Sequence, residues 1–98
     1  MKQLLPYCTY VLLSEKDLKL YTGYTGDLEK RVAEHNAGKN TSTAHRIPLK
    51  LIFCEYYLFE EDARNREKYL KTSAGKKAIG LMLKSTLNSL RMHRELGP

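Results

Sequence analysis

The distribution of apolar and polar residues along the chain predicts three strands and three helices. Residues 7–13 and 18–24 are rich in β-branched and aromatic residues and flank the polar segment 14–17, which predicts a β-hairpin with a four-residue loop. Residues 49–58 are almost continuously apolar, so we expect a third strand in a central, well-buried position. Helical composition and periodicity predict helices over 27–37, 60–72 and roughly 75–94.

The order β-β-α-β-α-α predicts an α/β (α+β) fold, in which helices flank a small, three-stranded, mostly antiparallel sheet. If Leu13 and Leu18 flank the hairpin loop, Tyr10 lies directly across from Tyr21 and both hydroxyls leave the same face of the sheet. Without further chemistry, such a pair is an ordinary cross-strand aromatic contact.

Polar residues interrupt the apolar stripes of two predicted helices. The inward stripe of the first helix contains Leu28, Arg31, Val32 and His35, and that of the second contains Ala63, Arg66, Glu67 and Leu70. Charged or titratable groups are costly to bury unless they meet a partner or line a wet cleft. Each of them has a plain structural explanation when taken singly, but together Arg31, His35 and Glu67 indicate a functional site.

Length and charge restrict the function classes. A chain of 98 residues predicts a single domain over 1–98, with a core at about 6–79 and a C-terminal helix and tail at 80–98, frayed from about residue 91. Seventeen Lys and Arg against eleven Asp and Glu give a net charge of +6, which favours nucleic acid as a partner ahead of an acidic membrane surface. The apolar start is too short for a signal peptide and no segment is long enough to span a bilayer, so we expect a cytoplasmic protein.

The two cysteines do not indicate a metal site or a disulfide framework. Cys8 and Cys54 lie far apart in the sequence, each inside an apolar run, without the paired spacing of zinc ligands. Both are therefore expected to be buried free thiols.

The order of these residues resembles the GIY-YIG nuclease domain. The matching positions are Tyr10, then Tyr21-Thr22-Gly23, then Arg31 and His35 within residues 28–36, then Glu67 within residues 63–71. The resemblance covers roughly Pro6 to Ile79 and is closest to small stand-alone bacterial members. The first motif keeps only its tyrosine, in Cys8-Thr9-Tyr10. Such a resemblance implies a metal-dependent endonuclease that hydrolyses phosphodiester bonds, in DNA ahead of RNA, with DNA repair or recombination as its setting.

The resemblance also implies roles for the catalytic set Tyr10, Tyr21, Arg31, His35 and Glu67. A tyrosine acts as general base, Tyr10 being preferred to Tyr21, and its pKa must be lowered by positive charge from Arg31, His35 or a metal. Arg31 grips the phosphate, and His35 hydrogen-bonds either the tyrosine or the phosphate. Glu67 holds one divalent ion, Mg²⁺ or Mn²⁺.

Several further residues are candidates for contacts with a nucleic-acid backbone. Gly23 leaves the sheet bare for close approach, and the basic candidates are Lys39, His45, Arg46, Lys50, Lys71, Lys76 and Lys77. For each cation, a solvated basic face is nearly as good an explanation, and Thr41, Ser42 and Thr43 are more typical of polar loop filler than of phosphate ligands.

The chain offers no obvious reader of base sequence. We therefore expect structure-selective or weakly sequence-specific cutting, with a protein partner or self-association supplying further specificity. Two alternatives stay open, namely a nucleic-acid-binding module of the same fold with weak or no cleavage, and a basic protein-interaction domain.

Overall fold

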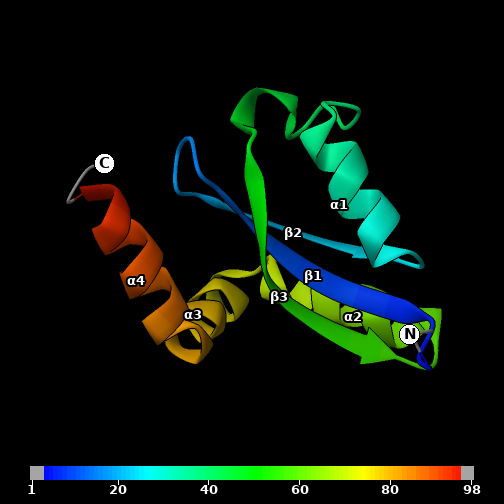
Figure 1. The fold of residues 1–98 in the computed structure, drawn as a ribbon. Coiled ribbons are helices and arrows are strands. Elements are labelled where there is room, and N and C mark those ends of the chain that lie inside the picture. Colours follow the sequence, from blue (N-terminus) through cyan, green and yellow to red (C-terminus); the bar gives the residue numbers. More distant parts are fainter. Residues whose placement is uncertain (1–3, 96–98) are drawn as a thin grey trace. The chain divides into compact units, whose positions relative to one another are not determined.

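A computed structural model describes residues 4–95, with side chains as far as Arg91. The chain forms two compact units, residues 1–67 and 68–98, and each is described by itself. The elements, in order, are β1 (Tyr7–Ser14), β2 (Leu20–Thr25), α1 (Leu28–Asn36), the 3-10 turn η1 (Ala44–Arg46), β3 (Leu49–Tyr57), α2 (Glu60–Leu70), α3 (Ser73–Met82) and α4 (Lys84–Glu95) (Figure 1). The predicted α+β fold with a three-stranded antiparallel sheet is confirmed. The prediction of one domain over 1–98 stays a prediction.

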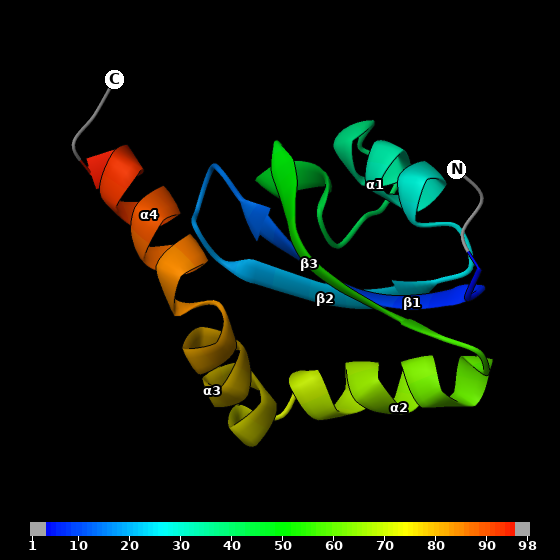
Figure 2. The same ribbon diagram turned by 60° about the horizontal axis from the view of Figure 1, so that its bottom comes forward.

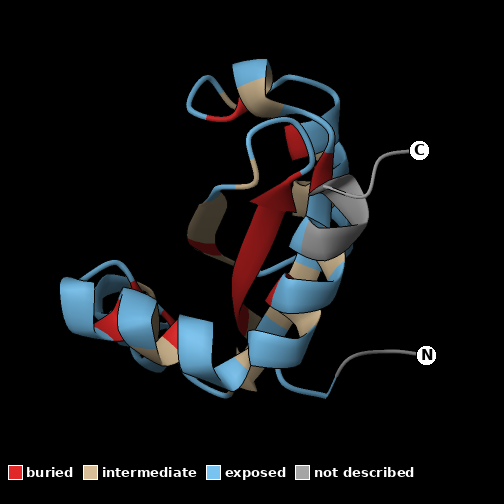
Figure 3. Ribbon diagram, turned by 90° about the vertical axis from the view of Figure 1, so that its left-hand side faces the viewer, coloured by how far each residue is buried: buried red, intermediate tan, exposed pale blue. Residues whose placement is uncertain are grey.

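The centre of the sheet is β1, which pairs with β2 on one side and β3 on the other. Every residue from Cys8 to Ser14 is buried, and β1 is the long red strand of Figure 3. The prediction that the third strand is central and well buried is wrong, because β3 lies at the edge of the sheet and only Leu49 in it is fully buried. An apolar run is equally compatible with a central strand and with an edge strand that packs on one face. The same edge position leaves Cys54 exposed, against expectation, whereas Cys8 is buried as expected; both are free thiols.

The hairpin register differs from the predicted one by two residues. Tyr10 pairs with Gly23, and Tyr21 pairs with Leu12. The turn begins one residue later than predicted, because the Ser14 hydroxyl accepts hydrogen bonds from the Lys16 and Asp17 amides and holds the loop that follows. A shift of two keeps the pleat in phase. Tyr10 and Tyr21 therefore still share one face, as diagonal neighbours whose ring centroids lie 6.4 Å apart.

Helices cover both faces of the sheet within residues 1–67 (Figure 2). On one face, Leu28 and Val32 of α1 pack against a buried cluster that includes Tyr10 and Leu12. On the other face, the buried Thr9 hydroxyl donates to the Ala63 carbonyl of α2 at 2.7 Å. The inward stripes predicted for both helices thus face the sheet.

Local chemistry fixes the ends of α1. The Asp27 side chain accepts a hydrogen bond from the Lys30 amide and caps the helix, and Gly38 follows the helix with a φ of +76°. Both follow the ordinary rules for helix starts and stops. The site helix therefore spans nine residues.

The second unit consists of helical segments. The helix predicted over 75–94 is present as α3 and α4, interrupted at Leu83, whose ψ of 27° departs from helical geometry. The buried apolar residues include Ile79 in α3 and Leu87 in α4. Helix α4 runs to Glu95, so the tail predicted to fray from residue 91 is helical that far, and residues 96–98 lie outside the described residues. Within the described chain, none of the helices has the length and apolar character needed to cross a membrane.

Two glycines of α3 are expected to respond oppositely to the same substitution. A Cβ on Gly75 would lie 2.0 Å from the Tyr69 carbonyl oxygen, so Gly75→Ala must push backbone apart and should lower the free energy of unfolding by about 3 kcal/mol. A Cβ on Gly80 would meet nothing within 4 Å, so Gly80→Ala should raise the free energy of unfolding by up to about 1 kcal/mol, because Ala has the higher helix propensity. Urea unfolding of both variants tests the pair, and equal stability would contradict the close packing at Gly75.

Candidate active site

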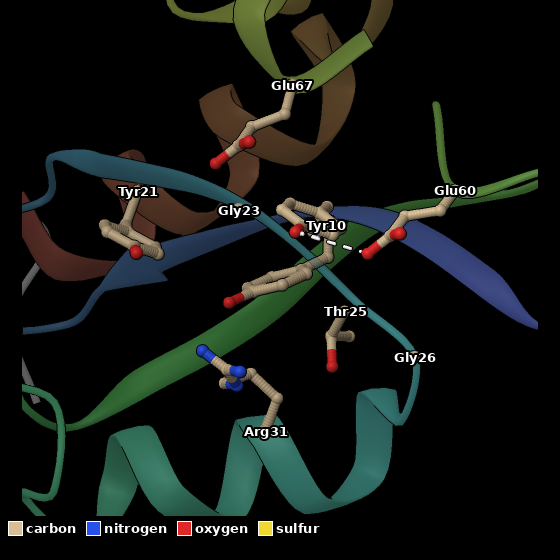
Figure 4. Close-up of a pocket in the computed structure, with 9 residues that line it drawn as sticks. Tyr10, Tyr21, Gly23, Thr25, Gly26, Arg31, Glu60 and Glu67 are labelled. Atoms are coloured by element: carbon tan, nitrogen blue, oxygen red, sulfur yellow. Dashed lines mark hydrogen bonds between the residues drawn. The ribbon is translucent and has the colours of Figure 1, made fainter. Parts of the chain in front are cut away.

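A polar pocket of about 440 Å³ brings most of the predicted catalytic set together. Its lining includes Tyr10 from β1, Tyr21 and Gly23 from β2, Arg31 from α1 and Glu67 from α2. In Figure 4, Arg31 and Glu67 point toward the same space from opposite sides, with the tyrosines between them. Residues more than 50 positions apart in the sequence thus converge because α1 and α2 cover opposite faces of one small sheet.

Tyr10 lies at the bottom of this pocket, with 1% of its surface exposed. A Cβ placed on Gly23 would lie 2.6 Å from the Tyr10 hydroxyl oxygen. The missing side chain at Gly23 is expected from the sequence to admit a substrate backbone. In the structure, the space beside Gly23 is occupied by the Tyr10 phenol. Tyr21 is half-buried beside it.

His35 supports the pocket from behind and does not line it. It is fully buried, with Nε2 2.9 Å from the Tyr10 hydroxyl and Nδ1 2.7 Å from the Thr43 hydroxyl. Of the two partners expected for His35, the tyrosine is the one that it contacts. Thr43 is also fully buried, so it is neither a phosphate ligand nor loop filler. A hydroxyl eight residues after His35 carries no sequence signal, because only the folded loop places it against the imidazole.

The pKa values of this chain of hydrogen bonds keep it uncharged at neutral pH. Burial, with a smaller effect from Arg31, lowers the pKa of His35 from its usual 6.5. A lowered pKa leaves the imidazole neutral at pH 7, which does not favour the expected supply of positive charge from His35 to a tyrosine. Burial and the neighbouring Tyr21 raise the pKa of Tyr10, whereas Arg31 lowers it and Glu67 raises it. Tyr10 is accordingly protonated in the free protein.

Arg31 is the cation of the pocket. Its side chain is 41% exposed, and its Nε lies 3.5 Å from Glu34 Oε1. Such a long, half-exposed contact is a weak ion pair, which a phosphate can replace. Arg31 also lines a neighbouring hollow of about 390 Å³ with Glu34, Lys39, Asn40 and Thr41. Lys39, one of the predicted backbone contacts, is thus brought next to the pocket through Arg31.

Glu67 is the residue that fits a metal ion. Among the described residues no group of three or more His, Cys, Asp and Glu side chains is arranged to hold a metal. Mg²⁺ is commonly bound through one or two carboxylates, with water and phosphate oxygens completing its shell, so a single carboxylate that faces an open polar pocket suits it. The same donor set does not suit structural zinc.

The pocket contains a second carboxylate that the sequence patterns did not indicate. Glu60, at the start of α2, lines it with Tyr24, and the Tyr24 hydroxyl donates to Glu60 Oε2 at 3.4 Å. The Arg64 guanidinium lies 5.7 Å from the centroid of the Tyr24 ring. Glu60 precedes Glu67 by two helical turns, so a search for carboxylates at seven-residue spacing along the predicted helix would have found it. Thr25 and Gly26 complete the lining.

The remaining predicted backbone contacts are dispersed. Arg46 pairs with Asp17 at 3.0 Å and fastens the β1–β2 loop, so its guanidinium has a structural partner. His45 and Lys50 are exposed in the first unit, outside both hollows. Lys71, Lys76 and Lys77 are exposed in the second unit.

Comparison with known proteins agrees with this geometry. The family model described as GIY-YIG catalytic domain matches residues 6–79. A UPF0213 protein of Clostridium perfringens is 33% identical over 86 residues, which cover 87% of this chain and 92% of that protein. UPF0213 proteins of Streptococcus pyogenes serotypes M5 and M3 are 46% identical over 56 residues, which cover 56% of this chain and 61% of theirs. No solved structure matches the chain. Because the family model spans well over half of its residues, this protein belongs to the GIY-YIG family, whose domains are generally endonucleases.

Proposed function

We propose that this protein is a metal-dependent endonuclease that hydrolyses phosphodiester bonds in DNA, with RNA as the second choice. One observation carries the proposal: a single pocket joins Tyr10, Arg31 and Glu67, and the Tyr10 hydroxyl is hydrogen-bonded to a buried, neutral His35. Hydrolysis needs a proton acceptor for the attacking water, a cation for the phosphate and a site for a metal ion. Each of these needs is met by one residue of the set.

In the proposed reaction, Arg31 leaves Glu34 and binds the scissile phosphate. A water molecule attacks the phosphorus, the new P–O bond forms and the bond to the leaving oxygen breaks. Tyr10 takes the proton of the attacking water while its own proton passes to His35 Nε2, and the leaving oxygen is protonated from solvent. The proton on His35 then returns through Tyr10 to solvent, which restores the neutral pair. The raised pKa of Tyr10 argues against a free phenolate but suits this transfer, because Tyr10 never carries a full negative charge.

Thr43 acts as a positioning residue in this scheme. If the His35 Nδ1–H donates to the Thr43 hydroxyl, then Nε2 is left as the acceptor that faces Tyr10. When bound, Mg²⁺ or Mn²⁺ on Glu67 supplies positive charge that stabilises the phosphate oxygens in the transition state. Tyr21, half-buried beside Tyr10, contacts the phosphate.

Substrate selection follows from the shape of the site. Because the pocket and the hollow beside it meet at Arg31, a strand of backbone can run from one to the other past Lys39. Such contacts position a strand without reading its bases. We therefore propose structure-selective or weakly sequence-specific cutting, in DNA repair or recombination, with a protein partner or self-association adding specificity.

A second candidate function is a nucleic-acid-binding module with little or no cleavage. It is favoured by the burial of Tyr10, which is only 1% exposed and has a raised pKa. The following experiments distinguish this binding module from the proposed endonuclease.

Substitution of the metal and phosphate ligands should abolish cleavage. A labelled panel of duplex, single-stranded, flap and branched DNA and RNA is incubated with Mg²⁺ or Mn²⁺. Relative to wild type, Glu67→Gln and Arg31→Ala should each cut at least about 100-fold more slowly, because charge stabilisation at the phosphate is lost. Glu67→Gln should keep its affinity. Wild-type binding without any cut would establish the second candidate, and strong preference for one short duplex sequence would contradict structure selection.

The two tyrosines should differ in their effect on rate. Tyr10→Phe removes the proton acceptor and should slow single-turnover cleavage by about 100-fold or more, whereas Tyr21→Phe should slow it by roughly tenfold. Both variants keep the ring and its packing, so melting temperatures serve as the control. A larger loss in Tyr21→Phe would assign the base to Tyr21.

Acidic pH should weaken the fold through His35. The lowered pKa keeps native His35 neutral at a pH where a histidine in the unfolded chain already binds a proton. The unfolded state therefore binds more protons below pH 6.5. As the pH decreases below this value, the free energy of unfolding should decrease by at most about 1.4 kcal/mol per pH unit. Urea unfolding at several pH values should show this dependence in wild type and in the exposed variant His45→Gln. This pH dependence should be missing in His35→Gln. An unchanged slope of stability against pH in that variant would contradict the assignment of the effect to His35.

A further inference from the structure

The net charge of the protein is confined to one of its two units. Residues 1–67, which contain every pocket residue named above, carry ten Lys and Arg and ten Asp and Glu. Residues 68–98 carry seven Lys and Arg and a single acidic residue, Glu95, so this short unit holds the whole net charge of +6. The unit with the candidate catalytic residues is electrically neutral.

Most arginines of the first unit are already paired inside it. Arg46 pairs with Asp17 at 3.0 Å, and Arg66 pairs with Glu55 at 3.0 Å. Arg31 contacts Glu34 at 3.5 Å. The first unit also has exposed lysines, but its ten acidic residues balance its ten cations, so it offers no net charge for long-range attraction of an anion.

The second unit has almost no acidic residues of its own. The sequence contains no Asp or Glu from Lys68 to Arg94, so the cations of this stretch are not balanced by carboxylates within it. The described cations are all exposed, namely Lys68, Lys71, Lys76, Lys77, Lys84 and Arg91. Ile79 and Leu87 are buried, and the surface of α3 and α4 carries the cations together with the exposed apolar side chains of Leu81 and Met82.

We infer that residues 68–91, with six cations and no acidic residue, form the element that binds the nucleic-acid backbone and supplies most of the electrostatic affinity, while residues 1–67 supply the chemistry. This inference rests on the proposed function for its ligand, since a helical surface with a large net positive charge attracts phosphates without reading bases. Helix α2 connects the two units along the chain, since the boundary between them lies between Glu67 and Lys68. The arm, residues 68–91, thus binds a strand of any sequence, and the pocket determines where that strand is cut.

Two triple variants of the full chain with the same net charge test the inference. Lys76→Gln/Lys77→Gln/Lys84→Gln removes three cations from the arm, and Lys16→Gln/Lys19→Gln/Lys30→Gln removes three exposed lysines from the first unit. Affinity for a labelled duplex is measured by fluorescence anisotropy over a salt series, in chelator so that nothing is cut. The arm variant should bind roughly tenfold more weakly, and the slope of log K against log salt should fall by about 2 to 3, whereas the control should stay close to wild type.

Equal losses in the two variants would overturn the inference, because total charge rather than its location would then set affinity. Wild-type binding to vesicles of anionic phospholipid without binding to duplex would overturn it as well, in favour of a membrane surface. Cleavage is followed separately at low salt with enzyme in excess, where the arm variant should cut within about twofold of wild type once bound. A wild type that binds with the expected slope but cuts nothing with Mg²⁺ or Mn²⁺ would overturn the proposed function and leave the role of the arm standing.

Discussion

The hydrogen bond between Tyr10 and His35 is the interaction on which the site depends. It joins the central strand to α1 across the buried face of the sheet, and both residues are almost fully excluded from solvent. A buried hydroxyl and a buried imidazole are each expensive without a partner, so satisfying both at once stabilises the fold and fixes the phenol in one orientation. Thr43 completes the chain by binding the second ring nitrogen. Structural stability and chemical positioning therefore come from the same three side chains.

Burial also determines the kind of acid–base chemistry that the site can perform. A phenolate at Tyr10 would be a buried anion close to Glu67, and the pKa of Tyr10 is raised accordingly. His35, held neutral by burial and by Arg31, is instead available as a proton acceptor. Transfer through the pair avoids a buried phenolate at Tyr10, but it places a proton on His35, where burial and Arg31 disfavour positive charge, so that proton is held only transiently. Arg31 and Glu67 carry their charges where the pocket is open and water or phosphate can solvate them.

The proposed separation of chemistry and binding between the two units would explain how so small a chain can hold both a site and a binding surface. A strongly basic surface beside Arg31 and the tyrosines would add like charges to the pocket and disturb its proton affinities. A neutral unit for the chemistry and a cationic helical arm for affinity separate the two demands.

The sequence by itself determined the elements, the α+β class and the identity of the inward-facing polar residues, because these follow from local periodicity. Arg31, His35 and Glu67 stood out as polar residues on apolar stripes, and the order of the motifs indicated the family. Only the tertiary structure decided that β1 and not β3 is the central strand, that Tyr10 pairs with Gly23, and that Thr43 contacts His35. Strand order, turn position and loop closure depend on contacts between residues far apart in the chain, which local patterns of hydrophobicity do not encode.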